Sequence, residues 1–187
     1  MNEDINLAAG TVLNGGLILY PTDTVWGIGC NALNPQAVEK VFLLKQRADS
    51  KSLIILLAEA KDIFQYVAAP PPDIIDQLKN FQRPTTVIYN QAIGFPDKLI
   101  AGDGSIGIRV TKDEFCKRLI KKIRVPLVST SANISGHPSA KTFPEITPEI
   151  KTGVDYVVNY RRNDLSEQPP SRIIRFLPDG SQEIIRQ

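Results

Sequence analysis

Short apolar runs of strand length recur along the chain, and polar segments separate them. The runs cover residues 16–20, 53–57, 85–89, 106–110, 126–129, 156–160, 172–176 and 183–186. Several are apolar almost throughout, which is typical of strands covered on both faces of a sheet. The pattern therefore predicts a β-sheet assembled from segments spread over most of the sequence.

Helical periodicity lies between some of these runs. Asn34 is a suitable N-cap, Pro35 suits the first turn, and the apolar residues that follow form one stripe. A second helix is expected from Thr111, with Glu114 completing a capping box, and a short one over residues 73–79. Strands mixed with helices predict an α/β (α+β) fold with a mixed sheet and flanking helices.

Composition narrows the class of protein. The chain has 187 residues, of which 42% are hydrophobic, so we expect a single domain over residues 1–187. A net charge of +2 is too small to indicate nucleic-acid binding by itself. With two cysteines, no CxxC and one histidine, neither a protein metal site nor a histidine-based triad is predicted. There is no basic leader and no apolar run near the ~20 residues of a membrane span, so we expect a cytoplasmic protein without a membrane partner.

Two polar stretches beside strand and helix ends are candidates for binding. Residues 20–27 (YPTDTVWG) follow an apolar run and read either as a turn or as part of a site. Lys45 and Arg47 stand at the end of the helix that Asn34 opens, with Lys51 close behind. These cations either complement the helix dipole or form a clamp for phosphate.

Two further stretches carry buried or clustered polar groups. Arg109 lies inside an apolar strand, where an unpaired charge is costly, so it needs either an internal carboxylate or an anionic ligand. Residues 128–136 (VSTSANISG) follow a strand with small polar side chains, and Ser131 and Asn133 can donate to phosphate or ribose oxygens. Neither a P-loop nor a GxGxxG signature is present.

In this order, the stretches resemble the YrdC/TsaC family of threonylcarbamoyl-AMP synthases. Residues 21–27 (PTDTVWG) resemble the family's Pro-Thr-(Asp/Glu)-Thr-Val-Tyr-Gly, and residues 45–47 match its Lys-x-Arg. Residues 131–133 match its Ser-x-Asn, residues 171–173 its late Ser-x-Ile, and Arg186 its closing arginine. The resemblance runs from about Gly15 to the last residues. It implies a twisted mixed sheet with a basic concave face.

The resemblance also implies a reaction and roles for the residues. Family members join L-threonine, bicarbonate and ATP into threonylcarbamoyl-AMP and pyrophosphate, Mg²⁺ accompanies the ATP, and other proteins transfer the threonylcarbamoyl group to tRNA. By motif match, Lys45 and Arg47 are the expected catalytic cations. The expected ATP-binding residues are Lys45, Arg47, Lys51, Ser105, Asn133 and Arg186. The expected threonine-binding residues are Thr24, Arg109, Ser131 and Ser171.

Several positions depart from the family's motifs. Ala48 stands where Lys-x-Arg is usually followed by Pro, and Lys51-Ser52-Leu53 replaces Lys-Pro-Leu. Trp26 replaces the usual Tyr. Residues 82–86 (QRPTT) replace Pro-Gly-Pro-x-Thr, so Arg83 takes the place of a glycine and either alters the loop or aims a new cation.

A basic segment on the second predicted helix leaves an alternative function open. Its cations are Lys117, Arg118, Lys121, Lys122 and Arg124. They form either a solvated helix face or a contact for tRNA or another RNA. The alternative to an enzyme is therefore a YrdC-like module that binds RNA or a nucleotide without making the adenylate.

Overall fold

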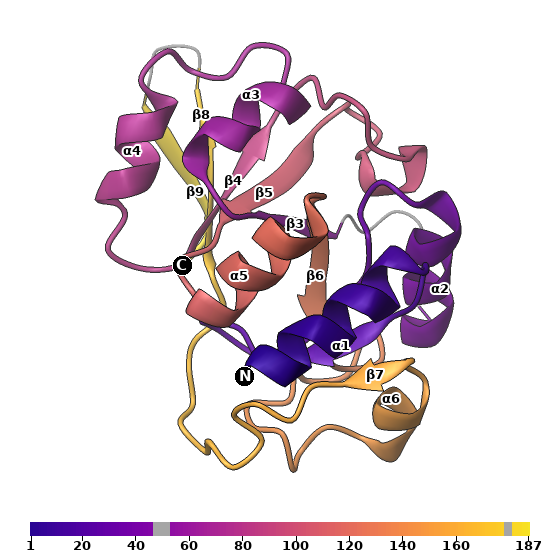
Figure 1. Ribbon diagram of the computed structural model, residues 1–187. Coiled ribbons are helices and arrows are strands. Elements are labelled where there is room, and N and C mark those ends of the chain that lie inside the picture. Colours follow the sequence, from indigo (N-terminus) through magenta and orange to yellow (C-terminus); the bar gives the residue numbers. More distant parts are fainter. Residues whose placement is uncertain (47–52, 178–180) are drawn as a thin grey trace.

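The computed structural model describes residues 1–46, 53–177 and 181–187 (Figure 1). Within these ranges, nine strands form one sheet in the order β7-β1-β2-β6-β3-β5-β4-β8-β9. The strands are β1 Ile18–Tyr20, β2 Gly27–Gly29, β3 Ile54–Leu57, β4 Thr85–Tyr89, β5 Ile106–Val110, β6 Leu127–Ser131, β7 Tyr156–Val157, β8 Arg172–Phe176 and β9 Gln182–Arg186. Three pairs are parallel (β1 with β7, β3 with β5, β4 with β8) and the other five are antiparallel, which confirms the predicted mixed sheet.

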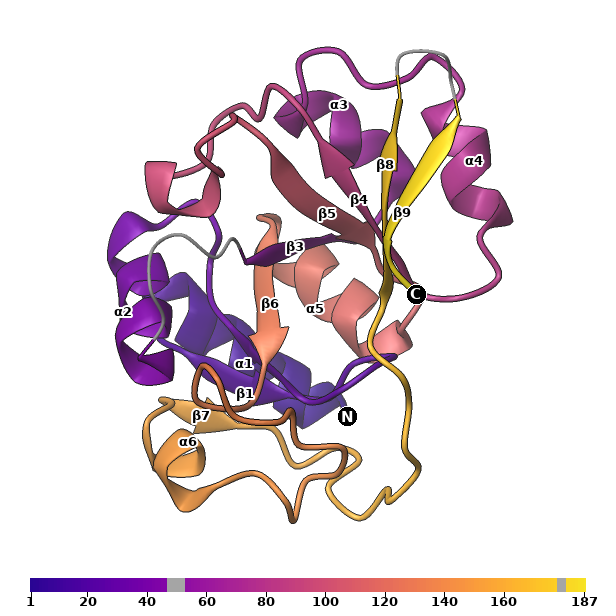
Figure 2. The same ribbon diagram turned by 180° about the vertical axis from the view of Figure 1, so that it is seen from behind.

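Helices flank this sheet. They are α1 Asn2–Leu13, α2 Pro35–Lys45, α3 Ile63–Tyr66, α4 Ile74–Asn80, α5 Glu114–Ile123 and α6 Pro148–Thr152, with short 3₁₀ turns at Ala60–Asp62 and Asp97–Leu99. Figure 1 shows α1 and α5 side by side in front of the sheet, and the reverse view in Figure 2 brings strands β3, β6, β8 and β9 to the front. Among the described residues, no helix has the length and apolar character that crossing a membrane requires.

Strand residues alternate between two hydrophobic cores. Leu19 and Ile55 belong to the larger core, which also holds the buried residues of α2, α3 and α4. Ile18, Tyr20 and Leu56 belong to the second core, under α1 and α5. Because successive side chains of a strand point to opposite faces, both faces of these strands are buried. This burial explains why the sequence shows continuous apolar runs.

The helix ends follow from local side chains. The Asn34 side chain caps α2 by accepting from the Ala37 amide at 3.1 Å, as the sequence predicted. The predicted start of α5 at Thr111 is wrong by a few residues, because Asp113 is the N-cap and accepts from the Cys116 amide at 2.8 Å. Thr111 instead accepts from the Asp113 amide at 3.1 Å, in a turn before the helix.

Two departures from the family motifs fit the fold without strain. Trp26 is buried, and its ring packs against Phe143 with the centroids 4.8 Å apart. In the described part of the chain, left-handed backbone at a non-glycine residue occurs at Gln46, Gln91, Arg124 and Arg161. Arg83 is outside that set, so the arginine does not occupy a glycine conformation.

Gly29 allows strands β1, β2 and β6 to approach closely, and its replacement should destabilise the protein. An added Cβ would lie 2.7 Å from Tyr20 Cε1 and 2.8 Å from the backbone oxygen of Val128. We expect Gly29→Ala to lower the free energy of unfolding by about 1–3 kcal/mol, as overpacked cores do. Urea denaturation measures this change.

Gly10→Ala is the matched control. Gly10 lies within α1, and nothing stands within 4 Å of an added Cβ. Alanine should therefore raise the free energy of unfolding by about 0.5–1 kcal/mol, because glycine weakens a helix interior. Equal effects of the two substitutions would show that the close strand contacts at Gly29 do not matter.

Candidate active site

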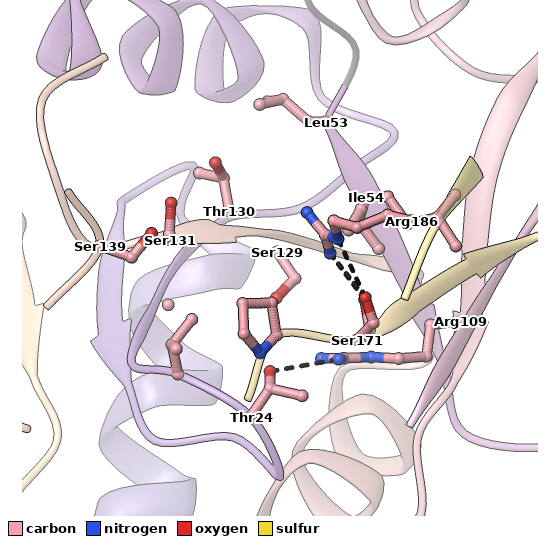
Figure 3. Close-up of a pocket in the computed structure, with 14 residues that line it drawn as sticks. Thr24, Leu53, Ile54, Arg109, Ser129, Thr130, Ser131, Ser139, Ser171 and Arg186 are labelled. Atoms are coloured by element: carbon pink, nitrogen blue, oxygen red, sulfur yellow. Dashed lines mark hydrogen bonds between the residues drawn. The ribbon is translucent and has the colours of Figure 1, made fainter. Parts of the chain in front are cut away.

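A cavity of about 240 Å³ opens on the sheet where β2, β3, β5 and β6 lie side by side (Figure 3). Four of the residues predicted to bind threonine line it: Thr24, Arg109, Ser131 and Ser171. Arg186, predicted to bind ATP, lines it as well. Side chains from five separate segments of the sequence therefore meet in one hollow.

Arg109 is the most deeply buried charge in this lining. Its side chain is 4% exposed, and its Nη2 lies 3.4 Å from Asp23 Oδ1. Nη1 donates to Thr24 Oγ1 at 3.2 Å, and Figure 3 shows the guanidinium pointing at this hydroxyl. Among the described residues, nothing hydrogen-bonds to Arg109 Nε or to Asp23 Oδ1. An internal carboxylate is thus present, as one alternative required, and Arg109 also lines the cavity, where an anionic ligand can approach it.

The loop between β1 and β2 presents Thr24 to the cavity. Thr22 Oγ1 accepts from the Thr24 amide at 3.0 Å and lies 2.9 Å from Thr24 Oγ1. Thr22 Oγ1 also donates to the Val25 carbonyl at 2.8 Å. The turn that the sequence allowed here is therefore real, and it places a hydroxyl in the site.

Ser171 and Arg186 form the opposite wall. Arg186 donates from Nε at 3.1 Å and from Nη2 at 2.8 Å to the Ser171 carbonyl, and both bonds are drawn in Figure 3. Ser171 Oγ lies 2.9 Å from Thr86 Oγ1. Burial, followed by the positive charge of Arg109, lowers the pKa of the Arg186 guanidinium. The positive charges of Arg109 and Arg186 therefore repel each other at one cavity. An anionic ligand between them would relieve this repulsion.

Lys45 is buried behind the loop that follows β6. Its Nζ donates to the Ser131 carbonyl at 2.5 Å and to the Asn133 carbonyl at 2.6 Å. The Lys45 carbonyl in turn accepts from the Ser135 amide at 2.8 Å. The end of α2 and the 131–135 loop are thus fixed to each other.

Asn133 lies beside this junction and lines a neighbouring cavity rather than the first. Its Nδ2 donates to the carbonyls of Ile134 at 3.0 Å and His137 at 2.6 Å. Its buried Oδ1 has no hydrogen-bond partner among the described residues. That oxygen is a free acceptor beside the Lys45 junction.

The remaining predicted ATP-binding residues are placed differently. Ser105 is buried just before β5 and does not line the cavity, and its amide donates to Asp103 Oδ1 at 3.0 Å. Arg47 and Lys51 lie outside the described residues. The contribution of these residues to ATP binding stays a prediction.

The cations predicted to contact RNA lie on α5 or at its end. Lys117 and Lys121 both approach Glu59 Oε1, at 3.6 and 2.6 Å. Arg118 donates to Asn2 Oδ1 at 2.7 Å. Acidic and amide partners thus engage part of this surface, and an RNA contact stays a prediction.

Sequence reasoning missed some residues of the lining. Ser129 and Thr130 belong to the polar stretch that was noticed, but the motif match named Ser131 alone. Ser139 gave no signal, because it lies in an ordinary polar segment. Thr86 does not line the cavity itself, but its hydroxyl is hydrogen-bonded to that of Ser171. It was detectable as a hydroxyl within an apolar strand.

Comparisons with known proteins agree with this arrangement. The Sua5/YciO/YrdC family model, described as "Telomere recombination", matches residues 11–187. A Methanocaldococcus jannaschii protein, provisionally named a threonylcarbamoyl-AMP synthase, is 39% identical over 170 residues, covering 90% of this chain and 78% of the relative. The threonylcarbamoyl-AMP synthase of Idiomarina loihiensis is 33% identical over 173 residues, with 91% and 92% covered.

A solved structure shares the fold. Sua5 of P. abyssi, crystallised with L-threonine, superposes with a TM-score of 0.84 at 26% identity over 97% of this chain. The match covers 53% of the Sua5 chain, so this chain spans about half the length of that relative.

Replacing Lys45 tests its role in fixing the 131–135 loop. Lys45→Met would leave the carbonyls of Ser131 and Asn133 without their charged donor, so we expect about 2–4 kcal/mol less free energy of unfolding. Urea denaturation measures the loss. Lys79→Met is the control, because the Lys79 side chain is 66% exposed and contacts Asp76 at the surface. If both variants unfold at the same urea concentration as the unmodified protein, the Lys45 bonds contribute nothing to stability.

Proposed function

Because the chain belongs to the Sua5/YciO/YrdC family, we propose that it is a threonylcarbamoyl-AMP synthase. In this reaction L-threonine, bicarbonate and ATP yield L-threonylcarbamoyladenylate and pyrophosphate. The observation that carries the proposal is the meeting of Arg109 with the hydroxyls of Thr24, Ser131 and Ser171 in one cavity. The names of the relatives support an enzyme over a module that only binds RNA or a nucleotide.

The amino acid is proposed to bind through Arg109. The planar guanidinium offers paired donors for the threonine carboxylate, and the buried surroundings strengthen that interaction. Thr24, Ser131 and Ser171 supply hydroxyls for the remaining polar atoms of threonine or of the new carbamate. P. abyssi Sua5, the structural relative crystallised with L-threonine, supports the amino-acid assignment.

The proposed reaction does not require a nucleophilic side chain of the protein. Once the threonine amine carries a carboxylate, that carboxylate attacks the α-phosphorus of ATP, so the nucleophile belongs to the substrate. Catalysis then depends on positioning and on neutralising charge. The proposed reaction therefore needs no histidine base, and His137, the sole histidine of the sequence, lines the neighbouring cavity with Asn133 rather than the first one.

The ATP side of the site is proposed from the motif match. Lys45 and Arg47 are the proposed catalytic cations, although Lys45 does not line the first cavity and its Nζ already donates to two backbone carbonyls. The proposed ATP-binding set also includes Lys51, Ser105, Asn133 and Arg186. Mg²⁺ is proposed to arrive with the nucleotide. Arg186 lines the first cavity and Asn133 the neighbouring one, which supports a ligand near these residues.

The product requires partners downstream. A threonylcarbamoyl-adenylate is an activated acyl donor, so threonylcarbamoyl-transferase proteins are proposed to pass the group to tRNA in the cytoplasm. For direct tRNA contact through the α5 cations, Lys117 and Lys121 would have to exchange their contacts with Glu59 for RNA phosphates.

A pyrophosphate assay tests the function. Purified protein is incubated with ATP, Mg²⁺ and bicarbonate, with and without L-threonine, and with serine and valine in its place. We expect pyrophosphate release that depends on threonine, and threonylcarbamoyl-AMP detected by mass spectrometry. Absence of both products would falsify the proposed function, and release with another amino acid alone would reassign the substrate.

Arg109→Lys tests the assigned role of the arginine. Lysine keeps the charge but loses the fork that binds a carboxylate, so kcat/KM for threonine should fall about 10²-fold, with a much smaller change in the KM for ATP. Steady-state kinetics measures both values. Arg175→Lys is the control, because Arg175 pairs with Asp103 away from the cavity. An unchanged KM and kcat in Arg109→Lys would remove Arg109 from the threonine site.

A further inference from the structure

A second cavity, of about 270 Å³, is lined by residues 21–24 of the loop that carries Thr24, together with Asp113 and Arg161. Thr24 lines both cavities, so this loop forms the wall between them. Arg161 lines the second cavity and not the first. It therefore stands behind the amino-acid site rather than in it.

Arg161 joins the loop to the start of α5. Its Nη2 donates to Asp113 Oδ2 at 2.5 Å, and the Asp113 side chain is 7% exposed. Its Nη1 donates to the Thr22 carbonyl at 3.4 Å. One planar guanidinium thus bonds a buried carboxylate and a loop carbonyl together.

The far end of this link is firmly anchored. Asp113 uses its other oxygen, Oδ1, to cap α5 through the Cys116 amide at 2.8 Å. The Arg161 guanidinium also lies over the Tyr160 ring at 5.1 Å, and that ring stacks on Phe115 of α5 with the centroids 5.9 Å apart. The position of Arg161 is therefore set by a helix whose apolar face is buried in the second core.

The backbone of Arg161 supports a specific role. Its φ is +63°, in the left-handed region, which is costly for a residue with a side chain. The contacts with Asp113, Thr22 and Tyr160 hold this conformation. Together these contacts hold the Arg161 guanidinium in a fixed position beside the Thr22 carbonyl.

On the loop side, the contacts of Arg161 lead through Thr22 and Thr24 to Arg109, the residue proposed to bind threonine. Thr22 contacts Thr24 through both the Thr24 amide and the Thr24 hydroxyl, and Thr24 Oγ1 accepts from Arg109 Nη1. We propose that Arg161, with Asp113, is a positioning residue for the amino-acid half of the site. It fixes the Thr22 carbonyl and so the orientation of Thr24 and Arg109 toward threonine. This inference rests on the proposed function.

Kinetics and direct binding test the inference together. Arg161→Met should raise the KM for threonine about tenfold, the scale of one lost charge-assisted hydrogen bond, and should change kcat and the KM for ATP much less. Calorimetric titration with L-threonine should show the same loss of affinity without any turnover. Arg161→Lys, which keeps the charge and one set of donors, should recover part of the affinity.

Two further variants separate positioning from general damage. Asp113→Asn keeps an oxygen to cap α5 but removes the charge that holds Arg161, so it should raise the KM for threonine in the same direction. Added to Arg161→Met, it should have little further effect, because both changes break one link. Arg162→Met is the matched control. Arg162 is the adjacent arginine, and it bonds the carbonyls of Val157 and Val158 instead of the loop.

The outcomes are distinct. A raised KM for threonine in Arg161→Met but not in Arg162→Met supports the inference. An unchanged affinity for threonine in Arg161→Met, or an equal loss in Arg162→Met, overturns it. A parallel fall of kcat and melting temperature without a change in affinity also overturns it, since that result indicates a purely structural residue. If the unmodified protein neither binds nor uses threonine, the proposed function itself fails.

Discussion

The buried guanidinium of Arg109 is the constraint around which the site is organised. An ion removed from water loses several kcal/mol of solvation, and the loss is recovered only with good partners. Arg109 has Asp23 at 3.4 Å and the Thr24 hydroxyl at 3.2 Å, yet its Nε has no hydrogen-bond partner in the described structure. The protein therefore holds a charge whose hydrogen-bonding capacity is not fully used. Such a charge suits an anionic ligand, which is why the threonine carboxylate is proposed to bind here.

Polar loops supply much of the rest of the site, and a charged side chain joins two of them to helices. Lys45, at the end of α2, holds the carbonyls of Ser131 and Asn133. Arg161 joins the Thr22 carbonyl to Asp113, the residue that caps α5. Loops rich in Ser, Thr and Asn have many conformations of similar energy, so they need such ties to present their hydroxyls in one arrangement. The cations near the cavity thus have structural partners as well as candidate ligands.

The sequence predicted the parts of the fold that depend on local pattern, and missed those that depend on contacts. Strands β4, β5 and β8 lie within their predicted runs, because each run carries β-branched or aromatic residues that enter the larger core. Strand β2 was missed, since Gly27 and Gly29 have no strand propensity and pair with β1 and β6 only in the folded chain. Helix α1 was also missed, although its Ile5, Ala8 and Val12 have helical spacing and are buried.

The site could be predicted as a set of residues, but not as a network. Of the described residues that the resemblance named, the cavity is lined by Thr24, Arg109, Ser131, Ser171 and Arg186, whereas Lys45, Ser105 and Asn133 do not line it. The resemblance gave no sign of the link from Asp113 through Arg161 to Thr22, because Asp113 and Arg161 lie outside the matched motifs and far from Thr22 in the sequence. A site whose nucleophile comes from the substrate depends on orientation more than on a reactive side chain, since the gain comes from holding the reacting groups together. Such a site therefore depends heavily on residues that never touch the substrate, and these are the residues that only the folded structure reveals.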